Sequence, residues 1–156
     1  MTDGAYRLVD VVLAEPAHYS REVEMEREVA LNDLMAESNF APAGSKGGPY
    51  RLILSVEEGR LVFDIRLEDG AAHGRTVLSL TPLRRVLRDY AQICEGYSKA
   101  LPDLPRERVE TIDMARRGLH DDGARLLRER LKGKIAVDFD TARRLFTLIA
   151  VLRMKG

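Results

Sequence analysis

The stretch YRLILSVEEGRLVFDIRLEDGAAHGRTVLSL, residues 50–80, alternates apolar and polar side chains along its runs. The first run ends at Glu57–Gly59 and the second at Glu68–Gly70, and both of these acidic tripeptides closed by glycine are typical of turns. A period of two broken by glycine turns is typical of an antiparallel meander with one buried face. The stretch therefore predicts three consecutive antiparallel strands.

Helices are predicted on both sides of this meander. Thr81-Pro82 combines a capping hydroxyl with a proline suited to the first helical position, and an apolar stripe at helical spacing follows from Leu83 to Tyr97. Ser20 and Asp140 are predicted to cap two further helices, and glycines are predicted to end two shorter ones. The ranges expected for these four are residues 20–38, 106–117, 122–131 and 140–154, and short strands are expected at 6–13 and 135–137.

These elements together predict an α+β fold. We expect a mainly antiparallel sheet of three to five strands, with four or five helices packed largely on one face. The chain has 156 residues, of which 45% are hydrophobic and 32% charged, values typical of a globular protein. A chain of this length can bury a substantial core, so residues 1–156 are predicted to form a single α+β domain.

The formal net charge is zero, but the charge is divided unevenly along the chain. Residues 1–74 carry 7 basic and 14 acidic side chains, whereas residues 75–156 carry 18 basic and 11 acidic ones. In one interpretation the two halves pack together and neutralise each other. In the other, the molecule is polarised and its basic face meets an anion.

Arginine pairs occur where two helices are predicted to begin, at Arg84-Arg85 and Arg143-Arg144. A helix N-terminus carries partial positive charge and disfavours cations, so a negative group is expected near each pair. That group lies either in this protein, for example among residues 22–28, or on a partner. Together with Arg88, these arginines are the predicted site for an anion or an acidic partner, since a guanidinium binds carboxylate or phosphate in a bidentate manner.

Other candidate sites are weaker. The sequence His120-Asp121-Asp122 has no diagnostic metal-ligand spacing, and Cys94 lies on an apolar stripe where a thiol is usually inert. We therefore predict no metal site, no cofactor and no catalytic residue. Residues 106–131 could form two helices joined by a glycine turn, as in DNA-reading modules, but a pI near 6.8 makes nucleic acid an unfavoured partner.

The last predicted helix is apolar on most of its circumference. Such a helix is either buried centrally or shared with a second subunit, and the second case predicts a homodimer. No stretch approaches the roughly 18 apolar residues of a membrane span, and a single cysteine fits a reducing compartment. The sequence thus predicts a cytoplasmic protein that does not bind membranes.

Several segments resemble those of a known family. They are GGPYRL (residues 47–52), EEGRLVFD (57–64), LSLTPLRR (78–85), ARRGLH (115–120) and VDFDTARRLFTLI (137–149). Through them the chain resembles a family of uncharacterised small proteins from alphaproteobacteria. The resemblance implies a bacterial cytoplasmic origin and implies no chemistry.

The function predicted from the sequence is therefore that of a small cytoplasmic binding or regulatory protein. Its arginine-bearing helix surface would engage an acidic partner, and we expect that partner to be a protein. The alternative is an enzyme that acts on an anionic small molecule and uses the same arginines as a clamp. Nucleic-acid binding is the third alternative.

Overall fold

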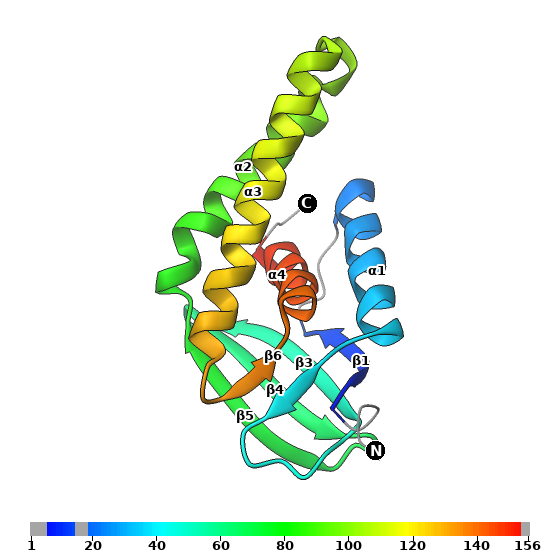
Figure 1. Ribbon diagram of the computed structural model, residues 1–156, viewed down its shortest axis with the longest axis vertical. Coiled ribbons are helices and arrows are strands. Elements are labelled where there is room, and N and C mark those ends of the chain that lie inside the picture. Colours follow the sequence, from blue (N-terminus) through cyan, green and yellow to red (C-terminus); the bar gives the residue numbers. More distant parts are fainter. Residues whose placement is uncertain (1–5, 15–18, 154–156) are drawn as a thin grey trace.

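The computed structural model describes residues 6–14 and 19–153 (Figure 1). The strands are β1 (Leu8–Leu13), β2 (Phe40–Pro42), β3 (Tyr50–Glu57), β4 (Arg60–Leu67), β5 (Ala72–Ser79) and β6 (Ile135–Val137). The helices are α1 (Arg21–Ala36), α2 (Arg84–Ala100), α3 (Arg106–Leu131) and α4 (Phe139–Arg153), with 3₁₀ turns at η1 (Thr81–Leu83) and η2 (Leu101–Asp103). The chain is an α+β protein, as its sequence predicted.

The predicted meander is confirmed as β3, β4 and β5, which pair antiparallel in that order. Alternate side chains of β3 and β4 are buried, as shown by Leu52 opposite Ile65 and Leu54 opposite Phe63. The sheet is nevertheless mixed, because β1 adds to the edge of β3 in parallel. A parallel neighbour requires a crossover connection, and α1 lies within that connection. The short strands β2 and β6 form a separate antiparallel pair.

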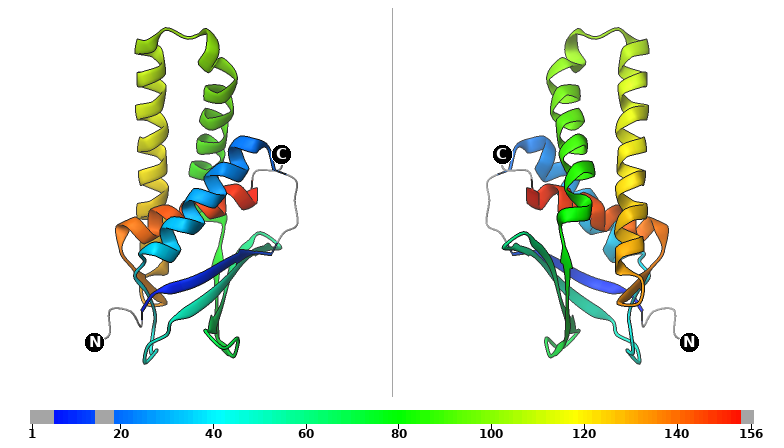
Figure 2. Two further views of the ribbon diagram at one scale, coloured as in Figure 1. Left: turned by 90° about the vertical axis from the view of Figure 1, so that its right-hand side faces the viewer. Right: turned by 90° about the vertical axis from the view of Figure 1, so that its left-hand side faces the viewer.

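The helices cover largely one face of the four-stranded sheet. Helices α1 and α4 lie over that face, and α2 and α3 form a long antiparallel hairpin that projects away from it (Figure 2). Helix α4 lies centrally and contacts α1, α2, α3 and β3. Its buried side chains surround the helix: Leu145, Phe146, Leu148, Ile149, Val151 and Leu152.

The position of α4 bears on the predicted dimer. Of the two interpretations of a helix that is apolar on most sides, the structure shows central burial, so α4 no longer requires a second subunit. Homodimerisation stays a prediction without that support. Within the described ranges, no helix is both long and apolar enough to cross a membrane.

Residues 106–131 form one continuous helix, so the two predicted helices and the turn between them are wrong. Gly118, predicted to end the first helix, lies within α3. A single glycine costs a helix interior roughly 1 kcal/mol, which tertiary packing readily outweighs. The proposed resemblance to a DNA-reading module depended on that turn and is therefore wrong.

Two predicted helix caps are also wrong. Thr81 lies inside η1, whose N-cap is Leu80, and makes no side-chain cap. Helix α4 begins at Phe139, so Asp140 lies inside it, and Asp138 instead accepts a hydrogen bond from the backbone N–H of Thr141 at 2.9 Å. Arg143 and Arg144 are therefore the fifth and sixth residues of α4, beyond the first turn in which the helix dipole acts most strongly.

Replacing Asp138 by alanine is expected to lower the free energy of unfolding by about 1–2 kcal/mol. Asp138 also accepts a hydrogen bond from Asn39 Nδ2 at 2.7 Å. Although burial opposes it, hydrogen bonds from Thr141 and Asn39 hold the pKa of Asp138 below its usual range. The matched control is Asp140→Ala, since the Asp140 side chain is 76% exposed. Urea denaturation should separate the two variants, and equal losses would contradict the assigned cap.

Candidate functional site

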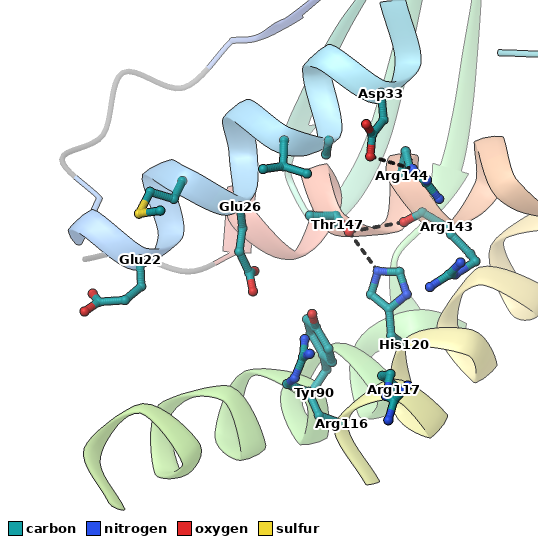
Figure 3. Close-up of a pocket in the computed structure, with 13 residues that line it drawn as sticks. Glu22, Glu26, Asp33, Tyr90, Arg116, Arg117, His120, Arg143, Arg144 and Thr147 are labelled. Atoms are coloured by element: carbon teal, nitrogen blue, oxygen red, sulfur yellow. Dashed lines mark hydrogen bonds and ion pairs between the residues drawn. The ribbon is translucent and has the colours of Figure 1, made fainter. Parts of the chain in front are cut away.

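An open groove of about 620 Å³ runs between α1 and the α2–α3 hairpin, with α4 along its floor (Figure 3). A volume of this size is typical of ligand-binding clefts. One wall comes from α1, the opposite wall from α3 with Tyr90 of α2, and the floor from α4. Segments far apart in the sequence therefore meet at this groove, which is the candidate functional site.

The α1 wall exists because α1 has apolar side chains on two faces. Ala30 and Leu34 are buried beneath the helix. Met25 and Val29, one turn apart, face the groove and are each 59% exposed. Large apolar side chains at this exposure leave part of α1 without a packing partner among the described residues.

The opposite wall is basic. Arg116 and Arg117 of α3 line it, and both form ion pairs with Asp113, at 2.9 and 3.2 Å. The hydrogen bond from Arg116 holds the pKa of Asp113 below its usual range. The predicted helix of residues 106–117 would place these two arginines at its end, but they lie in the middle of α3 and face the groove.

The floor carries the second predicted arginine pair. The Nε atom of Arg143 lies 3.2 Å from Asp121 Oδ1, and Arg144 Nε donates a hydrogen bond to Asp33 Oδ2 at 3.2 Å. Arg143 is also within 3.9 Å of Asp140. Both guanidinium groups therefore already have a carboxylate of the same chain beside them.

His120 lies where wall and floor meet, and its Nε2 atom is 2.7 Å from the hydroxyl of Thr147. That hydroxyl donates its single proton to the carbonyl of Arg143, so it accepts one from His120 Nε2–H. Burial, reinforced by the nearby Arg143, lowers the pKa of His120 to about 4. His120 is therefore neutral at pH 7, with its Nδ1 atom unprotonated.

Aromatic packing fixes the inner end of the groove. The ring centroids of Tyr90 and His120 are 5.4 Å apart, and both rings also contact Phe146, which is fully buried. Burial raises the pKa of Tyr90 and of Cys94, so both groups stay protonated at neutral pH. Cys94 thus has none of the thiolate character that a reactive cysteine needs.

The arginines predicted as a site do not come together in one place. Arg143 and Arg144 line the groove, whereas Arg84, Arg85 and Arg88 lie at the start of α2, outside it. Arg88 pairs with its neighbour Asp89 at 3.3 Å. Arg84 and Arg85 are exposed and have no acidic partner in the part of the chain that the structure describes.

Three groups of residues at the groove were missed from the sequence. The first is Met25 with Val29, whose spacing of four residues does signal a second apolar face. The second is Arg116 with Arg117. The third is the contact between His120, named above only as part of a weak metal candidate, and Thr147. These residues are 27 positions apart and meet only through tertiary packing. Across residues 6–14 and 19–153, no cluster of three or more His, Cys, Asp or Glu residues is arranged to hold a metal ion.

The fold and the groove define a small α+β protein whose helical layer is divided by an open, charged cleft. The chain belongs to the uncharacterised protein family UPF0262, whose family model matches residues 5–155. This membership confirms the resemblance drawn from the sequence motifs. No solved structure matches the chain.

Relatives in alphaproteobacteria match the whole chain or nearly all of it. The UPF0262 protein of Rhizobium leguminosarum bv. trifolii is 52% identical over 157 residues, covering 100% of both chains. The UPF0262 protein of Brucella canis is 57% identical over 152 residues, covering 96% of this chain and 95% of the relative.

Proposed function

We propose that the protein is a binding protein and that its groove holds an amphipathic helix of a partner protein. The observation that carries this proposal is the pair Met25 and Val29, exposed on the wall of an open groove. Amphipathic helices bind in such grooves by placing apolar residues against an apolar strip.

The dimensions of the groove support a helical occupant. Its α1 wall extends from Glu22 to Asp33, which at 1.5 Å per residue is about 16 Å, or three helical turns. The occupant would contact Met25 and Val29 on one side and the α3 wall on the other. Such a partner would act inside the cell if the cytoplasmic location predicted from the sequence holds.

The acidic partner predicted from the sequence is a separate proposal with a different surface. It requires arginines that are not already neutralised, and Arg84 with Arg85 meet that requirement. The exposed start of α2 would then be its docking surface.

Affinity capture with a set of variants tests both surfaces. The wild-type protein is immobilised, and proteins retained from a lysate of its bacterium are quantified by mass spectrometry. We expect Met25→Gln with Val29→Gln to reduce retention of the partner at least tenfold. Both side chains are exposed, so the melting temperature should stay nearly unchanged.

The matched control is Val12→Gln with Val77→Gln. These valines are also exposed, at 47% and 39%, but lie on the sheet and not at the groove. Equal losses in both pairs of variants would contradict the groove as the docking site. A partner lost only on Arg84→Gln with Arg85→Gln would instead support the acidic-partner surface.

One observation favours the enzyme alternative. Tyr90, His120 and Arg116 converge on the inner end of the groove, and a histidine that is neutral at pH 7 can accept a proton as a general base. Against it, each arginine of the groove is paired with an aspartate of the same chain, which leaves no free clamp for an anion. An anionic substrate would have to displace these carboxylates.

A further inference from the structure

The groove is lined by four arginines, yet its spare charge is negative. Arg116 and Arg117 pair with Asp113, and the remaining two pair with aspartates of α1, α3 and α4. Those aspartates are Asp33, Asp113, Asp121 and Asp140, so four positive charges meet four negative ones. His120 is neutral at pH 7 and adds nothing to this balance.

The charges that remain are Glu22 and Glu26. Both line the groove from α1, and neither makes a hydrogen bond or ion pair with any residue in the described ranges. Figure 3 shows Glu26 extending from α1 into the groove, toward the side where Tyr90 and Arg116 lie. Burial raises the pKa of Glu26, and the nearby charge of Arg116 only partly opposes that rise.

These glutamates alternate with the exposed apolar pair along one face of α1. Glu22, Met25, Glu26 and Val29 follow at steps of three, one and three residues, so all four share a face. A helix laid against this face meets apolar side chains and carboxylates at every turn. The helix that best complements this face of α1 has an apolar stripe with basic residues beside it.

We therefore propose that the partner helix is basic, with lysine or arginine side chains that reach Glu22 and Glu26. This inference rests on the proposed function and specifies the partner that it leaves open. It reverses the expectation for this site drawn from the arginine content, because the arginines are neutralised within the fold and the glutamates are not.

Two synthetic peptides of 18 residues test the inference. They share one leucine stripe at helical spacing and differ only in the flanking positions, which are lysine in one and glutamate in the other. Binding to the full-length protein is followed by fluorescence anisotropy at low salt. We expect the lysine peptide to bind at least tenfold more tightly than the glutamate peptide.

Charge variants of the protein identify which glutamates cause the preference for the lysine peptide. Glu22→Gln with Glu26→Gln should weaken the lysine peptide about tenfold. The control Glu24→Gln with Glu28→Gln removes the same charge, including one glutamate of the first turn, from positions that do not line the groove. It should change the affinity less than twofold. Equal effects of the two double variants, or tighter binding of the glutamate peptide, would overturn the inference.

The same experiments distinguish failure of the proposed function from failure of the inference about charge. If Met25→Gln with Val29→Gln abolishes binding of both peptides while the charge preference is absent, the groove still docks a helix and only the basic character is wrong. If neither peptide binds at millimolar concentration, or if Met25→Gln with Val29→Gln has no effect, helix docking in the groove is itself contradicted.

Discussion

Replacing Gly123 by alanine is expected to lower the free energy of unfolding by about 2 kcal/mol. Gly123 is buried where α3 crosses α4, and a Cβ atom there would lie 2.3 Å from Cε1 and Cζ of the Phe146 ring. Phe146 is fully buried against Tyr90 and His120, so its ring has no free space to occupy. The overpacking therefore exceeds the roughly 1 kcal/mol that alanine gains over glycine in a helix.

Gly118→Ala is the matched control in the same helix. A Cβ atom at Gly118 would meet nothing within 4 Å, so this variant should gain up to about 1 kcal/mol. Thermal denaturation should place the two melting temperatures on opposite sides of the wild type. If Gly123→Ala were as stable as Gly118→Ala, the close packing of α3 on α4 would be wrong.

The stability of the protein is expected to fall as the pH drops from about 6.5 to 4, in part through His120. Burial, together with Arg143, lowers the pKa of His120 to about 4, whereas an unfolded histidine titrates near 6.5. Between these values the unfolded chain binds the extra proton, so the contribution of His120 is complete above pH 6.5 and lost by about pH 4. Allowing for partial exposure, we expect a contribution on the order of 2 kcal/mol.

His120→Gln isolates this contribution. Glutamine can still donate a hydrogen bond to Thr147 but does not titrate. Glu26, whose pKa is raised by burial, acts in the opposite direction, because it favours the folded state as the pH falls. That effect is shared by both proteins and cancels in their difference. The difference in unfolding free energy between wild type and variant should therefore shrink from pH 7.5 to pH 4.5, and a constant difference would contradict a neutral, buried His120.

Most of the sheet could be predicted from the sequence because its signals are local. The alternation of residues 50–80 specifies strands, turns and the buried face without reference to the rest of the chain. The parallel pairing of β1 could not be predicted, because strand direction depends on how α1 carries the chain across the sheet. The helix end predicted at Gly118 was wrong because propensity competes with packing, and a helix of 26 residues is stabilised along its base by α4.

The site was only partly accessible to sequence reasoning. The arginine pairs were recognised, but not all of their acidic partners could be. Asp33 and Arg144, for example, lie far apart in the sequence, and no spacing rule connects such residues. When the aspartates that pair with these arginines are unknown, the excess of arginine suggests an acidic ligand. Once those ion pairs are known, the unpaired charges of the groove among the described residues are the carboxylates of Glu22 and Glu26. The spacing of Met25 and Val29 marks an apolar pair, but only the fold shows that no element among residues 6–14 and 19–153 covers them.

The most direct test of the groove as a docking site is a labelling footprint on α1. Val29→Cys is made in a Cys94→Ala background and reacted with a fluorescent maleimide, with and without the partner retained by the wild type. We predict rapid labelling of the free protein and at least tenfold protection by the partner, whereas Val77→Cys on β5 reacts equally in both states. Labelling of Val29→Cys that is slow in the free protein, or unchanged by the partner, would contradict an open groove that binds a helix.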